Sequence, residues 1–238
     1  GSEMCIRDSY CAISPDGTSI AFTYKGDIYT VPVNGGKAAQ ITTNAAHDTH
    51  PVWSPDGKQI AFASDRMGSM DIFVVDREGG IPKRLTTHSG NETPVAFKDA
   101  DHILFLANVM PSAEDAQFPS GQFQQVYEVS TTGDRPVMFS SMPMEDISIN
   151  KTGNALLYHD KKGYEDPWRK HHTSSITRDI WLCSLDGKRS YRKLTSFNGE
   201  DRTPVWASDG KSFYYLSEEK GSFNVFKRAL DGTSSTQL

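Results

Sequence analysis

A repeated tetrapeptide, Ser-Pro-Asp-Gly, is the feature that most constrains how this chain can fold. It stands at residues 14–17 and again at residues 54–57, which is 40 residues later. Weaker copies of the surrounding segment follow at residues 94–105 and 147–158, and a clear copy with Pro-Val-Trp ahead of Asp-Gly follows at residues 204–215. A repeat of this length indicates a fold assembled from several similar units.

Each copy of the repeat predicts a β-hairpin, because two short apolar runs flank Asp-Gly or a degenerate form of it. Asp-Gly tolerates the positive φ angles that a tight turn needs. A polar, apolar β-branched, aromatic triplet follows every hairpin and suits a third strand, at residues 27–29, 71–73, 125–127, 179–181 and 224–226. After a further glycine turn, we expect a short closing strand at residues 41–42, 85–86, 137–138 and 194–195.

Four antiparallel strands per unit, repeated five times in the same order, predict an all-β chain that forms a β-propeller of about five blades. A β-sandwich also has many short strands, but it does not repeat one ordered motif. The expected blades span residues 10–45, 46–90, 91–143, 144–198 and 199–238. Residues 1–9 match no repeat and are interpreted as a non-native head, derived from a tag or an adapter. Trp53 and Trp206 share one motif position, taken by Phe97 in the third unit, and are expected to fill space between blades.

Composition excludes several classes of function. The net charge of −5 argues against a nucleic-acid partner, and no stretch is long and apolar enough for a membrane span. The three cysteines have no metal-ligand spacing, and no nucleophile elbow, zinc-protease helix or phosphate loop is present. The sequence therefore predicts no catalytic residue, no metal site and no cofactor within this chain.

Two sets of residues are candidates for binding. An acidic residue recurs just before each inner strand, at Asp48, Glu92, Asp146 and Asp201. Four such acids around the mouth of the central channel would favour a cationic group such as a peptide amino terminus. The alternative is that each acid caps a local turn through its side chain.

Long insertions provide the second set. They interrupt the connection between the second and third strands at about residues 110–122 and 160–178, so both should project from one face of the scaffold, where binding loops usually lie. The second insertion offers Trp168, Arg169, His171 and His172 for a docking or gating loop. Its alternative is a solvated loop, and the adjacent histidines lack the further ligands that a zinc site needs.

The segment at residues 51–86 resembles the WD40-like repeat of TolB-type and tricorn-type propellers, in Ser-Pro-Asp-Gly-Lys, Ile-Ala-Phe, Ser-Asp-Arg-x-Gly and Asp-Ile-Phe. The resemblance covers residues 10–238, and the run of blades looks most like the N-terminal propeller of bacterial tricorn-type serine peptidases. It implies a ring of six or seven blades, of which this chain is a fragment. It also implies a C-terminal peptidase domain with an inserted PDZ module, and a periplasmic or other extracytoplasmic location.

The leading hypothesis is a non-catalytic propeller that serves a serine peptidase in substrate gating, substrate selection or subunit packing, with a peptide or protein as its partner. One alternative is a TolB-like interaction propeller without enzymatic activity. A second alternative is the propeller lid of a prolyl-oligopeptidase-type hydrolase. Five blades would leave two apolar sheet faces uncovered, so we expect either a strained closed ring or self-association into a homo-oligomer.

Overall fold

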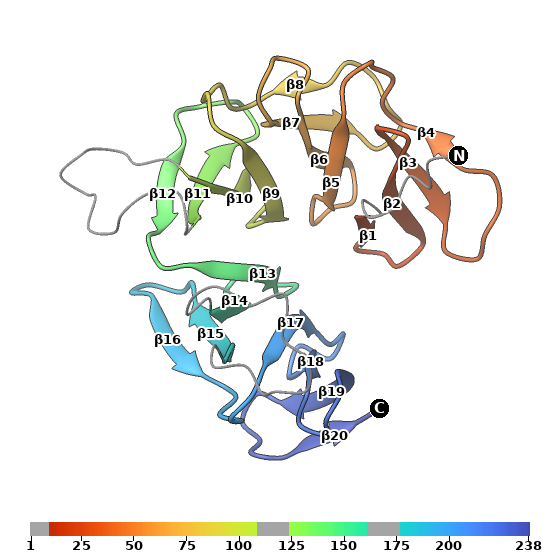
Figure 1. The fold of residues 1–238 in the computed structure, drawn as a ribbon. Coiled ribbons are helices and arrows are strands. Elements are labelled where there is room, and N and C mark those ends of the chain that lie inside the picture. Colours follow the sequence, from red (N-terminus) through yellow and green to blue (C-terminus); the bar gives the residue numbers. More distant parts are fainter. Residues whose placement is uncertain (1–9, 109–123, 161–176) are drawn as a thin grey trace. The chain divides into compact units, whose positions relative to one another are not determined.

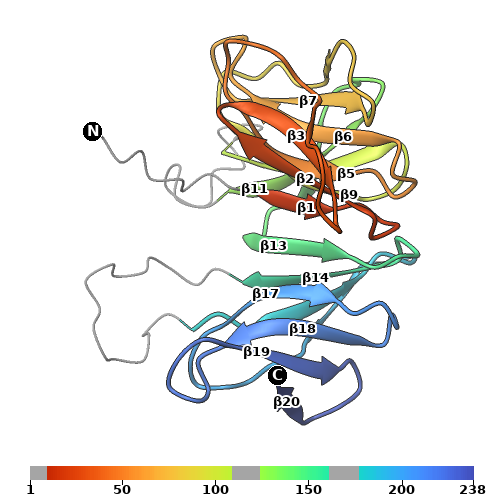
Figure 2. The ribbon, with the colours of Figure 1, turned by 90° about the vertical axis from the view of Figure 1, so that its right-hand side faces the viewer.

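The computed structural model describes residues 10–108, 124–160 and 177–238, and every regular element in this part of the chain is a strand. The strands form five four-stranded sheets, each built from strands that are consecutive in the sequence (Figures 1 and 2). Neighbouring strands run antiparallel, as in the β2–β3 and β6–β7 pairs. This arrangement confirms the predicted all-β propeller blades. The same residues include no helix suited to crossing a membrane.

The first three blades belong to one compact unit, which ends at Met142. Blade 1 comprises β1 (Cys11–Ile13), β2 (Ser19–Tyr24), β3 (Asp27–Pro32) and β4 (Ala39–Gln40). Blade 2 comprises β5 (Asp48–Trp53), β6 (Gln59–Ser64), β7 (Asp71–Asp76) and β8 (Lys83–Arg84). Blade 3 comprises β9 (Glu92–Phe97), β10 (His102–Ala107), β11 (Gln125–Ser130) and β12 (Val137–Ser140).

The last two blades form a second compact unit, which begins at Pro143. Blade 4 comprises β13 (Met144–Ile149), β14 (Ala155–Asp160), β15 (Ile180–Ser184) and β16 (Ser190–Lys193). Blade 5 comprises β17 (Asp201–Trp206), β18 (Ser212–Ser217), β19 (Asn224–Ala229) and β20 (Ser235–Gln237).

The repeated tetrapeptide forms a self-contained turn between the first two strands of a blade. In blade 1, Ser14 Oγ donates to Asp16 Oδ1 at 2.5 Å, and the Thr18 N–H donates to the same oxygen at 3.0 Å. Gly17 closes the turn with φ of +70°, a region that favours glycine. These hydrogen bonds stabilise the ionised carboxylate and lower the pKa of Asp16 to about 2. Blade 2 repeats this turn, with Ser54 Oγ and the Lys58 N–H donating to Asp56 Oδ1 and with φ of +68° at Gly57.

Apolar side chains pack between consecutive blades within each unit. Trp53 donates its indole N–H to the Ala12 carbonyl of blade 1 at 3.0 Å, and Trp206 donates to the Ser148 carbonyl of blade 4 at 2.9 Å. Phe97 lies in the core between blades 2 and 3. The prediction that these three residues fill space between blades is confirmed.

The closing strands of blades 1, 2 and 4 do not lie at the residues predicted from the sequence. They end one residue before the predicted pairs at residues 41–42, 85–86 and 194–195. The reason is a threonine hydroxyl that takes over the last hydrogen bond of the sheet. Thr42, Thr86 and Thr195 accept the N–H of Ile28, Ile72 and Ile180, each at 2.9 Å. In blade 3 the strand continues to Ser140 and includes the predicted residues 137–138.

Three inner strands contain a bulge at which a residue other than glycine has positive φ. His50 in β5, Asp146 in β13 and Thr203 in β17 have φ of +54°, +50° and +54°. The register of each strand against its neighbour shifts at this place. The three residues therefore occupy equivalent positions in blades 2, 4 and 5.

Candidate functional site

The start of an inner strand lies beside the connection between the second and third strands of the preceding blade. Asp48 N donates to Gly26 O at 2.7 Å, and Glu92 N donates to Met70 O at 2.8 Å. In the second unit, Asp201 N donates to Arg178 O at 3.0 Å. These contacts define what we call the link face of each unit, where the blade-to-blade links meet the connections between second and third strands. The acids predicted from the sequence lie on or near this face.

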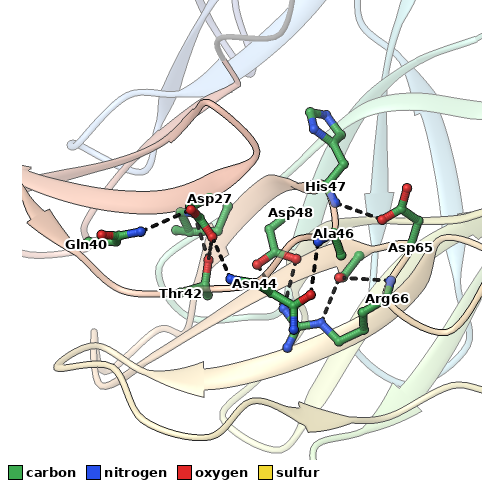
Figure 3. A network of polar contacts seen from close by, with 11 residues as sticks. Asp27, Gln40, Thr42, Asn44, Ala46, His47, Asp48, Asp65 and Arg66 are labelled. Atoms are coloured by element: carbon green, nitrogen blue, oxygen red, sulfur yellow. Dashed lines mark hydrogen bonds and ion pairs between the residues drawn. The ribbon is translucent and has the colours of Figure 1, made fainter.

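Asp48 is fully buried at the link face, and its negative charge is balanced by the guanidinium of Arg66 (Figure 3). Arg66 Nη2 donates to both of its carboxylate oxygens, at 2.9 and 2.8 Å. Arg66 Nε also donates to Ser64 Oγ at 2.8 Å, and its guanidinium lies over the Phe73 ring at 4.6 Å from the centroid. Removing either partner would leave an uncompensated buried charge, which is strongly destabilising.

A chain of polar contacts fixes the link between blades 1 and 2 around this ion pair (Figure 3). Asp27 accepts from the Gln40 amide at 3.0 Å and from the Asn44 N–H at 3.2 Å. The side-chain oxygen of Asn44, Oδ1, accepts a hydrogen bond from the backbone N–H of Ala46 at 3.0 Å. Asp65, on the connection between β6 and β7, accepts from the backbone N–H of the link at 2.8 Å. Both blades therefore hold the link in place.

Glu92 is also buried, and a hydroxyl from the preceding blade binds it. Thr86 Oγ1 donates to Glu92 Oε2 in a short hydrogen bond. Burial raises the pKa of Glu92 to about 7, and the neighbouring carboxylate of Asp71 contributes to the increase. Asp71 itself forms an ion pair with Arg84 Nη2 at 2.8 Å. The junction between blades 2 and 3 thus contains two buried acids and one arginine.

The junction between blades 4 and 5 repeats this arrangement. Asp201 is buried, and burial raises its pKa although the hydroxyls of Ser217 and Thr195 donate to it. Asp179, which is equivalent to Asp71, pairs with Lys193 Nζ at 2.8 Å. Three of the four predicted acids are thus enclosed by side chains of the protein, an arginine for Asp48 and hydroxyls for Glu92 and Asp201. A role of Asp48, Glu92 and Asp201 in ligand binding stays a prediction.

Asp146 is not equivalent to the other three acids. It lies at the bulge of β13, and Met144 holds the first position of that strand. Blades 2 and 5 have the same bulge, so the difference lies in the sequence of blade 4, where a methionine replaces the acid at the start of the strand and an aspartate stands two residues later. Its side chain is half exposed and accepts from Thr203 Oγ1 at 2.7 Å. Among the four acids, Asp146 is therefore the one whose carboxylate reaches solvent.

A histidine that the sequence analysis missed lies directly behind Asp146. His159 is buried in β14, at the register position that Ala63 holds in blade 2 and Leu216 holds in blade 5. Its Nδ1 accepts the Thr203 N–H at 3.2 Å, so its Nε2 carries the proton that it donates to Glu145 Oε2 at 3.2 Å. The sequence contains a signal for this residue, because His159 is polar and the residues at the same position in blades 2 and 5 are apolar.

Charged residues from both blades surround this histidine. Arg178 forms a short hydrogen bond to the buried Glu200 and lies 3.7 Å from Glu145 Oε2. Arg202 approaches Glu200 at 3.6 Å and lies over the Phe223 ring at 4.0 Å. We call the set Glu145, Asp146, His159, Arg178, Glu200, Arg202 and Thr203 the blade 4–5 cluster.

The blade 4–5 cluster joins an imidazole, two carboxylates and a hydroxyl through hydrogen bonds. In the described part of the chain, neither ring nitrogen of His159 contacts a hydroxyl or a thiol, which a nucleophilic mechanism would require. Thr203 directs its hydroxyl to Asp146 instead. The arrangement holds one solvent-facing carboxylate in a fixed position, which is what recognition of a cationic group needs.

The remaining predicted binding residues, Trp168, Arg169, His171 and His172, lie outside the described residues, as do residues 110–122 of the first insertion. Within residues 10–108, 124–160 and 177–238, no group of three or more His, Cys, Asp or Glu side chains is arranged to hold a metal ion.

Relatives of known sequence agree with the fold. The chain is 25% identical over 219 residues to tricorn protease homolog 1 of Streptomyces coelicolor, an alignment that covers 92% of this chain and 20% of that protein. It is 34% identical over 225 residues to an uncharacterised protein of Agrobacterium fabrum, covering 90% of this chain and 70% of that protein. The chain thus spans about a fifth of the length of the tricorn protease homologues that it matches.

Solved structures share the same fold. A putative TolB from Agrobacterium tumefaciens superposes with a TM-score of 0.71 at 15% identity, covering 96% of this chain and 79% of that one. The tricorn protease superposes with a TM-score of 0.70 at 20% identity, covering 97% of this chain and 22% of that one. The family model of the tricorn protease N-terminal β-propeller domain matches residues 9–238. The chain therefore belongs to the family of tricorn protease N-terminal β-propeller domains.

Proposed function

We propose that this chain is the non-catalytic propeller segment of a tricorn-type serine peptidase, and that it selects peptide substrates. The observation that carries the proposal is the family match over residues 9–238. Its support from the structure is the blade 4–5 cluster, which presents a carboxylate and no activated nucleophile among the described residues. A peptidase domain that follows the propeller would supply the chemistry.

Asp146 is the residue that we propose to contact the substrate, through a peptide amino terminus or another cationic group. Its carboxylate is half exposed, and Thr203 holds it in place. Glu145, which is partly exposed, and the buried Glu200 add negative charge close to it, although Arg178 and Arg202 offset part of that charge. An exposed ion pair of this kind contributes modestly, by about 0.2–1 kcal/mol.

Peptide binding tests this role. We expect Asp146→Asn to weaken binding of a peptide with a free amino terminus by roughly two- to five-fold. Binding of the same peptide with an acetylated amino terminus should not change. Fluorescence anisotropy with a labelled peptide measures both affinities.

The matched control is Asp186→Asn, which removes the same charge from the exposed turn between β15 and β16. This turn lies at the opposite end of blade 4 from the link face, so the variant should bind both peptides like the wild type. Equal loss of affinity in the two variants, or no preference for the free amine in the wild type, would contradict the role of Asp146.

A TolB-like interaction propeller without enzymatic activity is the second candidate. It is favoured by the extent of two matches, since the chain covers 70% of the Agrobacterium fabrum protein and 79% of the putative TolB chain. The genomic sequence downstream of Leu238 separates the candidates. A serine peptidase domain there supports the first, and a stop codon after one or two more blades supports the second.

The extracytoplasmic location stays a prediction from the resemblance. Fractionation of cells that express the complete gene, with immunodetection of the propeller in periplasmic and cytoplasmic extracts, measures it.

A further inference from the structure

A single threonine of blade 5 connects His159 with Asp146 in blade 4. Thr203 donates its backbone N–H to His159 Nδ1 at 3.2 Å and its hydroxyl to Asp146 Oδ2 at 2.7 Å. The same carboxylate oxygen lies 3.7 Å from His159 Nδ1. The ring is buried, whereas the carboxylate is half exposed. A buried imidazole therefore lies directly behind the solvent-facing carboxylate of the blade 4–5 cluster.

The hydrogen bonds of this network require the neutral form of His159. A backbone N–H can only donate, so Nδ1 carries no proton while it accepts from Thr203. The ring proton is on Nε2, which donates to Glu145 Oε2 at 3.2 Å. A second proton would go to Nδ1, where it would remove the acceptor of the Thr203 N–H. It would also place a donor 3.7 Å from Asp146 Oδ2.

Charged groups from several elements surround this network. They lie on β13, ahead of β15, on the link into β17 and on β17 itself, and after β18, and they are Glu145, Asp146, Arg178, Glu200, Arg202 and Glu218. The two arginines form their ion pairs with Glu145 and Glu200. Asp146 is therefore the carboxylate that a protonated ring can take as its partner at Nδ1.

The fold of a blade does not itself need a histidine at this position. Blade 2 has Ala63 and blade 5 has Leu216 at the same register position. A buried polar side chain costs free energy unless its hydrogen bonds are satisfied, so an aliphatic residue would serve packing alone. What His159 adds is a group that can change its charge.

We propose that His159 regulates Asp146 by protonation, so that this site binds a cationic group at neutral pH and releases it at acidic pH. The inference rests on the proposed function, in which Asp146 recognises a peptide amino terminus. With a neutral ring, the carboxylate keeps its charge for the ligand. With a charged ring, the Nδ1–H pairs with Asp146 Oδ2 and competes with the ligand. Histidine is the side chain that ordinarily changes its charge between about pH 5 and pH 8.

Peptide binding at two pH values tests the regulation. Fluorescence anisotropy gives the affinities for a peptide with a free amino terminus and for its acetylated form, at about pH 5.5 and about pH 7.5. We expect the preference for the free amine to be roughly two- to five-fold smaller at the lower pH, which is the contribution assigned to Asp146. The ordinary pKa of an amino terminus is about 8, so its own titration would change the preference in the opposite direction.

Two variants of the histidine remove the response. His159→Asn offers an amide oxygen to the Thr203 N–H but takes up no proton, so its preference should be the same at both pH values. His159→Leu should also lose the response, and it should fold, because Leu216 holds the equivalent position in blade 5. Circular dichroism checks the fold of both variants.

The matched control is His88→Asn. His88 Nδ1 also accepts a backbone N–H, that of Gly90 at 2.9 Å, but it lies on the link between blades 2 and 3. This variant should keep the pH response of the wild type.

Nitrogen NMR of the imidazole provides a readout that does not depend on a peptide. At about pH 7.5 the His159 signal, which His159→Asn identifies by its loss, should show a proton on Nε2 and none on Nδ1. In Asp146→Asn the ring should take up its second proton at a lower pH than in the wild type, because an amide stabilises an imidazolium less than a carboxylate does. Unchanged proton uptake would overturn the proposal.

The binding results separate the regulation from the proposed function. A preference for the free amine that is equal at both pH values overturns the regulation and leaves the proposed function intact. A pH response that persists in His159→Asn overturns the regulation in the same way. No preference for the free amine at either pH refutes the proposed role of Asp146 and the regulation with it.

Discussion

At the residue scale, burial of Glu92 makes the stability of the protein depend on pH. The folded state raises its pKa from 4.5 to about 7, so between these values the folded protein holds a proton that the unfolded chain has released. Stability is therefore fully present below pH 4.5 and falls as the pH rises towards 7, by up to roughly 3 kcal/mol. Asp71 and Asp201, whose pKa values burial also raises, act in the same direction.

We expect Glu92→Gln to flatten this dependence, since an amide keeps the shape and the acceptor for Thr86 but does not ionise. Urea unfolding at several pH values between 4.5 and 7.5 measures the effect. Asp56→Asn is the control, because hydrogen bonds lower the pKa of Asp56 and its titration lies at more acidic pH. An unchanged slope in the Glu92 variant would show that this carboxyl does not carry the dependence.

The sequence predicted some of the side chains that lie at the link face. The recurrence of Asp48, Glu92 and Asp201 is a true repeat, because each begins an inner strand. Asp146 also precedes the apolar run of its blade, but it stands two residues after Met144, which holds the position of the other acids. His159 follows the copy at residues 147–158 as Leu216 follows the copy at residues 204–215, so the sequence holds the signal, but the repeat motif ends one residue before it.

At the element scale, the tryptophan of the repeat joins neighbouring blades. Trp206 combines packing on blade 4 with a hydrogen bond from its indole to the Ser148 carbonyl. We expect Trp206→Phe to lower the free energy of unfolding by about 1–3 kcal/mol, because the carbonyl loses its donor. Urea denaturation measures this, with Ser208→Ala in the exposed hairpin as a control. A loss no larger than that of the control would mean that the indole hydrogen bond contributes nothing.

Hairpins and strand order followed from the sequence because Asp-Gly turns and strand periodicity are local properties. The ends of the closing strands in blades 1, 2 and 4 did not, since the final hydrogen bond of these sheets passes from the backbone to a threonine hydroxyl. A side chain that replaces a backbone acceptor leaves no trace in the pattern of apolar residues.

At the scale of the whole molecule, the blades are divided between two compact units, and hydrophobic clusters join consecutive blades within each unit. We expect Leu157→Ala in blade 4 to destabilise the second unit by about 2–5 kcal/mol, because the substitution leaves a cavity in its core. Unfolding of the first unit should not change. Hydrogen exchange with mass spectrometry reads both units in one experiment, and equal loss of protection in both would show that they unfold together.

The bulge of the inner strand has a consequence for how such proteins diversify. His50, Asp146 and Thr203 occupy it in three blades, so one backbone conformation accepts an imidazole, a carboxylate and a hydroxyl. The residue at a bulge does not take part in the regular ladder of the strand, and the bulge changes the direction of its side chain. The blade can therefore accept different residues at this position without a change in its core packing. This position is therefore a natural site for engineering, where exchanging one residue per blade would change what the scaffold recognises while the core of the blade stays intact.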